Sequence, residues 1–428
     1  MAKEKPNLNS VFVGHVDAGK STVVGRLMFD SGAVSEQEMT KLRAEAEKHG
    51  KAGFEFAYVM DNIKEERERG VTIDLSYKKI MTQKYQITII DAPGHRDFVK
   101  NMITGASQAD AAFLVVAAPT GVEPQTTEHL WLLRTAGVKN IVVAINKMDA
   151  VEYKEDRYNK VKEEVGALLK GVGVNPETTN FIACSGLKGD NVFKKSENMA
   201  WYKGPTIMEQ FDIFPEPKQP TDLPMRMPVQ DVYEITGAGT VPVGKITSGI
   251  MKLGQKVIVL PGRTGKGIEG EVRTIEMHHE TINQADAGDN VGINIRGIGK
   301  KDIARGDVIC DAAKPMAVVE EFLATITVIN HQTVLAKGYT PVFHVHTAQV
   351  PCQISELIEQ IDPKTGEVSK KNPDFLKNGD SAKVRIRPQG NLCIETSKDN
   401  PSMSRFSIRD AGQTVAAGVC TEIVKKKA

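Results

Sequence analysis

The sequence has few cysteines and no excess of charge of either sign. Its five cysteines stand singly, without a Cys-x-x-Cys pair, so we expect neither a disulfide framework nor a zinc site built on paired cysteines. The 55 Lys and Arg residues nearly cancel the 54 Asp and Glu residues, which leaves a net charge of +1. Such a chain has no general attraction for nucleic acid, so local contacts must hold any RNA that it binds.

Long apolar segments are missing as well. The longest apolar run, residues 111–119, has nine residues, whereas a helix that spans a membrane needs about 20. The first ten residues are polar and contain no apolar stretch typical of a secretory signal. We therefore expect a cytoplasmic protein that does not enter a membrane.

The alternating histidines His344 and His346 are the other candidate metal ligands. Since no nearby carboxylate or cysteine pair completes a site, we expect them to be ordinary strand residues.

The first half of the chain alternates short apolar runs with helical patterns, which predicts an α/β domain with a mostly parallel sheet and helices on both faces. The runs expected to form strands are 11–13, 87–90, 112–118, 141–145 and 181–183. Between the first two runs, Ser35 followed by Glu38 predicts the capped start of a helix in an inserted segment. Gly50 would end this helix.

The second half has the composition of all-β barrels. Five of the 20 prolines fall within residues 215–228 and predict a stiff linker. Short β-branched stretches punctuated by glycine follow, and only residues 355–361 show a helical period. A second break near residues 311–315 divides this half. We expect an α/β domain at 1–218 and two all-β barrel domains at 219–312 and 313–428.

Residues 14–21, Gly-His-Val-Asp-Ala-Gly-Lys-Ser, match the phosphate-loop pattern between an apolar run and a helical stretch. In such a loop, backbone N–H groups turn toward phosphate, the lysine reaches the β- and γ-phosphates, and the last hydroxyl can bind Mg²⁺. A plain glycine-rich turn is the alternative. The residues assigned to this site are Gly14, His15, Val16, Asp17, Ala18, Gly19, Lys20, Ser21 and Thr22.

A second motif favours guanine as the base. Asn146-Lys147-Met148-Asp149 follows the run 141–145, and an aspartate can accept from N1–H and the exocyclic amine of guanine, whereas adenine has an acceptor at N1. The stem of Lys147 can lie across the base. Alone, the tetrapeptide is equally typical of a turn. Backbone N–H groups after the next run are expected to close over the base, at Ser185, Gly186 and Leu187.

A third motif, Asp91-Ala92-Pro93-Gly94, ends the run 87–90. It could be a simple turn, but beside a phosphate loop it predicts a carboxylate near a metal and a glycine N–H that approaches the γ-phosphate. Thr72 is the expected second hydroxyl on Mg²⁺, together with Ser21 and Asp91. The charged stretch before it, residues 64–69, is alternatively a solvated helix face.

These motifs in this order, with His95 directly after Gly94, resemble the translational GTPases. Residues 14–17, 91–98 and 101–105 are similar to the elongation factor 1-alpha family, the counterpart of bacterial elongation factor Tu, and the compact length favours an archaeal form. The resemblance covers essentially the whole chain. It implies a phosphate-loop GTPase that binds GTP or GDP with Mg²⁺ and delivers aminoacyl-tRNA to the ribosomal A site, with GTP hydrolysis triggering release.

The resemblance also implies roles for further residues. His95 would position the water that attacks the γ-phosphate, and Val16 and Val71 would gate that water. From the residues alone, His95 is equally a surface histidine. Six residues match family positions that contact tRNA: Glu276, His278 and Asn290 at the aminoacyl end, and Lys100, Asn101 and Arg305 at the 5′ end. Without the resemblance, Glu276 and His278 are more typical of a strand with two outward polar residues.

Partners and rival functions follow from the same comparison. The implied partners are aminoacyl-tRNA, the ribosome and a nucleotide exchange factor of the elongation factor 1-beta type, with release or ribosome-rescue factors as further candidates, and we expect a monomer. The GTPase subunit of sulfate activation and a GTPase partner of release or rescue factors are the alternatives. The matched aminoacyl pocket argues against both, and a cytoskeletal role would leave the nucleotide motifs unexplained.

Overall fold

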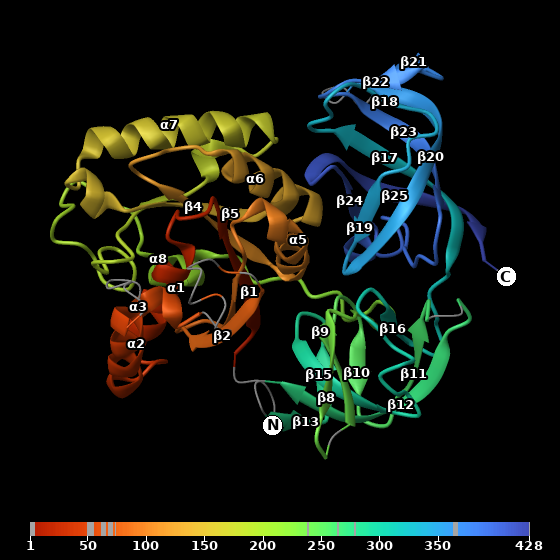
Figure 1. Cartoon of the computed structure of the whole chain (residues 1–428), viewed down its shortest axis with the longest axis horizontal. Coiled ribbons are helices and arrows are strands. Elements are labelled where there is room, and N and C mark those ends of the chain that lie inside the picture. The colour runs from red at the N-terminus through yellow and green to blue at the C-terminus, as the bar shows by residue number, and fades with distance from the viewer. Residues whose placement is uncertain are drawn as a thin grey trace. The chain divides into compact units, whose positions relative to one another are not determined.

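A computed structural model of the protein describes residues 5–48, 55–60, 66, 72, 74–237, 239–262, 265–277, 280–362 and 367–427. The chain divides into two compact units, Ala2–Pro217 and Lys218–Ala428 (Figure 1). Residues 214–225, which join the last helix of the first unit to the first strand of the second, contain neither helix nor strand.

A six-stranded sheet in the order β2-β3-β1-β4-β5-β6 organises the first unit. Only β2 runs antiparallel to its neighbour. The strands are β1 (Asn7–Gly14), β2 (Ser76–Met81), β3 (Gln86–Asp91), β4 (Ala111–Ala117), β5 (Asn140–Asn146) and β6 (Phe181–Ala183). All five predicted strands are confirmed. The edge strand β2 was not predicted, because its Ser-Tyr-Lys-Lys-Ile-Met sequence lacks a buried apolar run.

Helices cover both faces of this sheet, as predicted. Since successive strand residues point to opposite faces, Leu8 and Phe12 of β1 enter one core and Val11 and Val13 enter the other. The helices of the first core are α1 (Lys20–Asp30), α2 (Glu36–Lys48), α3 (Glu55–Tyr58) and α8 (Ile207–Ile213). Those of the second are α5 (Val99–Gln108), α6 (Pro124–Ala136) and α7 (Glu155–Gly171).

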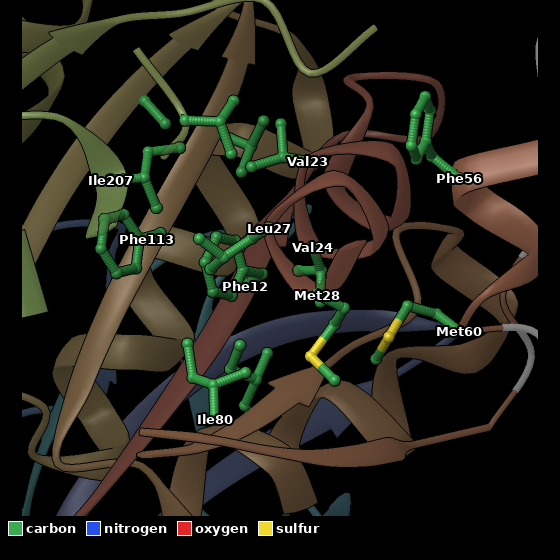
Figure 2. Packing of buried hydrophobic residues seen from close by; sticks show 14 of the residues in the cluster. Phe12, Val23, Val24, Leu27, Met28, Phe56, Met60, Ile80, Phe113 and Ile207 are labelled. Carbon is green, nitrogen blue, oxygen red and sulfur yellow. The ribbon is translucent and has the colours of Figure 1, made fainter. Parts of the chain in front are cut away.

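Figure 2 shows the first core around α1, with Phe12 and Phe113 from the sheet on one side of the helix and Phe56 of α3 on the other. The predicted start of α2 is confirmed, because the backbone N–H of Glu38 donates to the Ser35 hydroxyl at 3.2 Å. Its predicted end at Gly50 lies outside the described residues.

The strand order alone, without reference to side chains, indicates where a ligand site should lie. β1 lies between β3 and β4, so the chain leaves β1 toward one side of the sheet and later crosses to the other. Ligands of α/β sheets bind beyond the carboxyl ends of the strands where the order reverses. In this sheet that point is the end of β1, where the phosphate-loop motif begins.

The second unit is built from antiparallel strands, as predicted. An eight-stranded sheet follows the path β7-β16-β11-β12-β15-β9-β8, with β13 on β12. Its strands are β7 (Arg226–Pro228), β8 (Asp231–Ile235), β9 (Gly239–Lys245), β11 (Lys256–Leu260), β12 (Ile268–Met277), β13 (Glu280–Ile282), β15 (Asn290–Arg296) and β16 (Val308–Asp311). β10 (Ile250–Lys252) pairs with β14 (Gln284–Asp286).

The remaining strands form a seven-stranded sheet, β19-β24-β25-β17-β23-β20-β21, in which β19 also pairs with β20 and so closes a six-stranded barrel. These strands are β17 (Val319–Val328), β19 (Val342–Val345), β20 (Ala348–Ile361), β21 (Val368–Lys371), β23 (Ser381–Pro388), β24 (Arg405–Asp410) and β25 (Gln413–Lys426). β18 (Leu335–Ala336) pairs with β22 (Phe375–Leu376).

The helical period of residues 355–361 is misleading, because this segment belongs to strand β20. The pairing of β20 with β23 shifts between Ile354 and Glu356 and again between Leu357 and Glu359. Each bulge adds a residue to one strand. Two bulges therefore turn the alternation of a strand into apolar spacings of three and four, which resemble a helix.

Two findings concern candidate metal ligands and membrane contact. His344 lies on β19, but His346 follows the strand with a φ of 54°, so the two do not form the expected strand pair. Within the described residues, no cluster of three or more His, Cys, Asp or Glu side chains could hold a metal, and all five cysteines are buried free thiols. Among the residues that the structure describes, no helix is long and apolar enough to cross a membrane.

Candidate nucleotide-binding site

The phosphate-loop motif occupies the turn between β1 and α1. Asp17 and Gly19 have φ values of 62° and 87°, a left-handed conformation that makes the backbone reverse direction at the start of the helix. The ammonium of Lys20 donates to the carbonyl oxygen of His15 at 2.8 Å. Burial lowers the pKa of Lys20 to about 8, against the opposing effect of Asp91 and Asp17. A buried cation at the first turn of a helix is suited to binding a polyanionic ligand.

Gly94 brings the Asp-Ala-Pro-Gly segment directly against this loop. A Cβ atom at Gly94 would lie 2.4 Å from the Lys20 ammonium nitrogen and 3.0 Å from the carbonyl oxygens of Gly14 and His15. A side chain at this position would displace the ammonium and press against the backbone of the phosphate loop. The two motifs that the sequence separates by some 70 residues therefore meet at Lys20.

Hard oxygen ligands gather beside the same lysine. The hydroxyls of Ser21 and Thr72 lie 3.0 Å apart. Both carboxylate oxygens of Asp91 are buried without a hydrogen bond of ordinary length. Burial raises the pKa of Asp91 to about 6, and the Ser21 hydroxyl and Lys20 act in the opposite direction. Two hydroxyls and an incompletely satisfied buried carboxylate are ligands that suit Mg²⁺, so these residues fit the expected ion.

The charged stretch before Thr72 is not uniformly solvated. Glu66 is only 3% exposed, accepts a hydrogen bond from the backbone N–H of Asp74 at 3.1 Å and contributes to the raised pKa of Asp91. A solvated helix face is therefore wrong for Glu66. Val71, the second expected gate residue, lies outside the described residues.

The guanine motif ties three loops together. The side-chain amide of Asn146 donates to the carbonyl oxygen of Ala18 at 2.9 Å, and its oxygen accepts from the backbone N–H of Gly186 at 2.8 Å. The hydroxyl of Ser185 donates to the Asp149 carboxylate at 2.6 Å. One asparagine thus joins the phosphate loop to the loop at 185–187, and one serine orients the predicted base-reading carboxylate.

The backbone N–H groups of Ser185 and Gly186, which we expected to close over the base, donate instead to the carbonyl oxygen of Asp190 and to the side chain of Asn146. Lys147 and Leu187 are the other residues expected at the base. The Cε atom of Lys147 lies 3.9 Å from where a Cβ of Gly19 would be, which places its stem above the phosphate loop. Leu187 is exposed, at 42%. An exposed apolar side chain and a lysine stem beside one carboxylate are suited to enclosing a planar base.

His95 begins the short 3₁₀ helix η1 (Arg96–Phe98), directly after Gly94. Its Nδ1 accepts from the backbone N–H of Asp97 at 3.3 Å and lies 3.4 Å from the Asp97 carboxylate. With Nδ1 held by its own turn, Nε2 is the nitrogen left to contact a water. Val16, the expected gate residue that lies within the described part of the chain, is half-buried in the phosphate loop.

His129 supports the phosphate loop although no pattern in the sequence indicates it. The backbone N–H of Gly14 donates to Nδ1 of His129, which is fully buried on α6. His129 therefore holds the first residue of the phosphate loop from across the sheet. A histidine within an amphipathic helix, 115 positions away, gives no signal of this contact in the sequence.

Both predicted tRNA residues of the first unit lie on α5. Lys100 is exposed, whereas Asn101 is buried and its amide donates to the Asp74 carboxylate at 3.3 Å. Asp74 in turn follows Thr72 by two residues, so α5 is tied to the segment that carries the Thr72 hydroxyl.

In the second unit, Glu276 on β12 pairs with Gly292 on β15, two residues from Asn290. Directly paired residues and those two apart share one face of a sheet, so Glu276 and Asn290 lie on the same outer face as Gly292. A Cβ atom at Gly292 would lie 3.3 Å from the side chain of Val241 and 3.5 Å from that of Val243. Arg305 is exposed in the loop before β16. His278 lies outside the described residues.

A phosphate loop, a hydroxyl pair beside a buried aspartate, and a carboxylate oriented by a serine at the carboxyl end of a parallel sheet define a phosphate-loop nucleoside triphosphatase. Comparison with known proteins agrees. Residues 5–232 match the elongation factor Tu GTP binding domain, residues 239–310 match elongation factor Tu domain 2, and residues 321–421 match the GTP-eEF1A C-terminal domain-like family.

The chain is 58% identical to elongation factor 1-alpha of Methanocaldococcus jannaschii and 56% identical to that of Methanococcus vannielii, with full coverage of both chains in each case. A solved structure of translation elongation factor SelB from Methanococcus maripaludis with the GTP analogue GPPNHP has a TM-score of 0.71 at 22% identity, covering 99% of this chain and 80% of that one. The chain belongs to the elongation factor Tu family of translational GTPases. The resemblance to the archaeal elongation factor 1-alpha type is confirmed.

Proposed function

We propose that this GTPase delivers aminoacyl-tRNA to the ribosomal A site and releases it when GTP is hydrolysed. The observation that carries the proposal is its full-length identity of 53 to 58% with archaeal proteins named elongation factor 1-alpha. The family implies contact with aminoacyl-tRNA and the ribosome. The cytoplasm is the compartment in which a translation factor meets both.

Nucleotide binding uses the loop of residues 14–22 for the phosphates and Asn146, Lys147 and Asp149 for guanine, with residues 185–187 closing over the base. Ser21, Thr72 and Asp91 would hold Mg²⁺, with Asp91 acting through water. The ion would neutralise charge on the phosphates. The support for this assignment is the meeting of Lys20, Gly94 and the hydroxyl pair at one point.

The nucleotide state is sensed through Thr72 and Gly94. A γ-phosphate would hold both segments, and its loss would release them. Nucleotide switches use this order-to-disorder transition. Thr72 connects to α5 through Asp74 and Asn101. The tRNA contact at Lys100 and Asn101 therefore lies one hydrogen bond from the segment that responds to GTP.

Hydrolysis itself needs an oriented water. His95 follows Gly94, so one residue of chain brings its imidazole to the γ-phosphate, and its Nδ1 contact with η1 directs Nε2 outward. Val16 and Val71 form the apolar gate. Positioning and charge stabilisation account for most of the catalysis of phosphoryl transfer, so a side chain that orients water carries much of the rate.

The second unit supplies the aminoacyl contacts. Glu276 and Asn290 share an outer sheet face with Gly292 between them, and we assign this face, with His278, to the aminoacyl end of the tRNA. Arg305 is assigned to the 5′ end. The proposed division of labour is nucleotide binding at 1–218 and aminoacyl recognition at 219–312, followed by a C-terminal barrel at 313–428. An exchange factor of the elongation factor 1-beta type and release or rescue factors are proposed partners.

Binding of charged and uncharged tRNA in both nucleotide states tests the proposal. Aminoacyl-tRNA should bind the GTP form far better than the GDP form, and uncharged tRNA should bind neither tightly. Glu276→Gln should weaken charged tRNA while leaving GTP affinity unchanged. Equal affinities of charged tRNA for both nucleotide states would reject delivery, and equal affinities of charged and uncharged tRNA would favour one of the rival functions.

A further inference from the structure

Arg26 of α1 lies where three elements of the first unit meet. Its guanidinium carbon is 5.1 Å from the ring centroid of Phe56 on α3, which stands beside α1 in Figure 2. Its Nη1 donates to the carbonyl oxygen of Leu187 at 3.4 Å, and its Nε donates to the Asp30 carboxylate at 2.8 Å. One side chain thus contacts both α3 and the loop of residues 185–189, here called the base loop.

The base loop rests on the face of α1 that carries this arginine. A Cβ atom at Gly186 would lie 2.8 Å from the Val23 side chain, and a Cβ atom at Gly189 would lie 2.6 Å from the guanidinium carbon of Arg26. Val23 and Arg26 are three residues apart and therefore share one helix face. The first half of the base loop packs on Val23 and the second half on Arg26.

The position of the base loop decides the geometry of guanine recognition. Ser185 donates to the Asp149 carboxylate, and the Gly186 N–H is bound by Asn146. The backbone N–H of Gly189 donates to the Ser185 carbonyl at 2.8 Å, so the two ends of the loop move together. A contact that fixes the loop at Gly189 therefore also fixes the serine that orients Asp149.

We propose that Arg26 is a positioning residue that retains the guanine nucleotide, by holding the base loop while its guanidinium is supported on the ring of Phe56. The inference rests on the proposed nucleotide site. A guanidinium can stack on an aromatic ring and donate in its plane at the same time, which an ammonium cannot do. Its side chain is 23% exposed, so solvent only partly screens the contact.

Release of a fluorescent GDP from the full-length protein tests this role. Arg26→Ala should raise the dissociation rate about tenfold, the equivalent of ~1.4 kcal/mol, with the association rate unchanged. Arg26→Lys keeps the charge without the planar fork and should release GDP as fast as Arg26→Ala. Phe56→Leu should speed release in the wild-type background and add little to Arg26→Ala, because residues that act through one contact are not additive.

Asp30→Asn is the matched control, because it breaks the ion pair along α1 and keeps the guanidinium in place. It should release GDP at close to the wild-type rate. Wild-type release from Arg26→Ala or Arg26→Lys would overturn the inference. An equal acceleration in Asp30→Asn would also overturn it and assign the effect to the ion pair of the helix. Failure of the unaltered protein to retain GDP would instead refute the nucleotide site itself.

Discussion

Replacing Asp149 by asparagine should change which base the protein binds. Ser185 fixes the outcome, because its oxygen accepts from the Lys188 N–H at 3.1 Å while its hydroxyl donates to Asp149 at 2.6 Å. After Asp149→Asn, the carbonyl oxygen is the part of the new side chain that can accept from the Ser185 hydroxyl. The new amine must therefore face the base, where guanine presents donors and xanthine presents a carbonyl oxygen at the corresponding position.

The size of the effect follows from the hydrogen bonds that are lost. The carboxylate can accept two from guanine, and hydrogen bonds to charged groups contribute about 1.5–3 kcal/mol each. Loss of both weakens guanine nucleotide by about 3–6 kcal/mol, a factor on the order of 10² to 10⁴. Xanthine nucleotide should gain affinity, because its carbonyl oxygen matches the amine.

Competition against a fluorescent GDP or XDP measures both changes. In the unaltered protein, unlabelled GDP should compete well while XDP and ADP do not. In Asp149→Asn, XDP should displace the label at concentrations at which GDP fails. Equal competition by ADP and GDP in the unaltered protein, or equal weakening of GDP and XDP in the variant, would refute the assignment of Asp149 to the base.

Two further predictions concern catalysis and the metal site. His95→Ala should leave GTP and aminoacyl-tRNA binding nearly intact while ribosome-stimulated hydrolysis falls by a factor on the order of 10² or more; near-normal stimulated turnover would show that another group positions the water. In nucleotide-free and metal-free protein, burial raises the pKa of Asp91 from 3.8 to about 6. The folded state therefore binds this proton more tightly than the unfolded state does. The resulting contribution to the free energy of unfolding is fully present below about pH 4 and is lost as the pH rises through 6. Asp91→Asn should accordingly increase the free energy of unfolding above pH 6 by up to about 3 kcal/mol. Denaturant unfolding of both proteins between pH 4 and 8 measures this difference. The same pH dependence in the two proteins would contradict the raised pKa of Asp91.

Much of the fold was predictable because apolar runs and turn chemistry are local signals. The five parallel strands, the start of α2 at Ser35 and the β character of the second half all follow from patterns within a few residues. The exceptions have physical causes. β2 is an edge strand with polar residues, so it lacks an apolar run. The two bulges in β20 give its apolar residues the spacing of a helix.

The nucleotide motifs were predictable for a different reason, since phosphate and guanine each demand particular residue types at fixed spacings. The supporting residues were not. His129 and Arg26 act through single contacts to Gly14 and to the base loop, and neither contact leaves a periodic or spaced pattern in the sequence. Glu66 belongs to the same group, because burial of one carboxylate within a charged stretch depends on tertiary packing alone.

Protection of the aminoacyl ester from hydrolysis tests aminoacyl-tRNA delivery most directly. The rate at which charged tRNA loses its amino acid is measured alone and with excess protein bound to a non-hydrolysable GTP analogue or to GDP. We expect strong protection in the GTP-analogue state, little protection in the GDP state, and loss of protection in Glu276→Gln. Hydrolysis at the same rate with and without the GTP-analogue form would contradict aminoacyl-tRNA delivery.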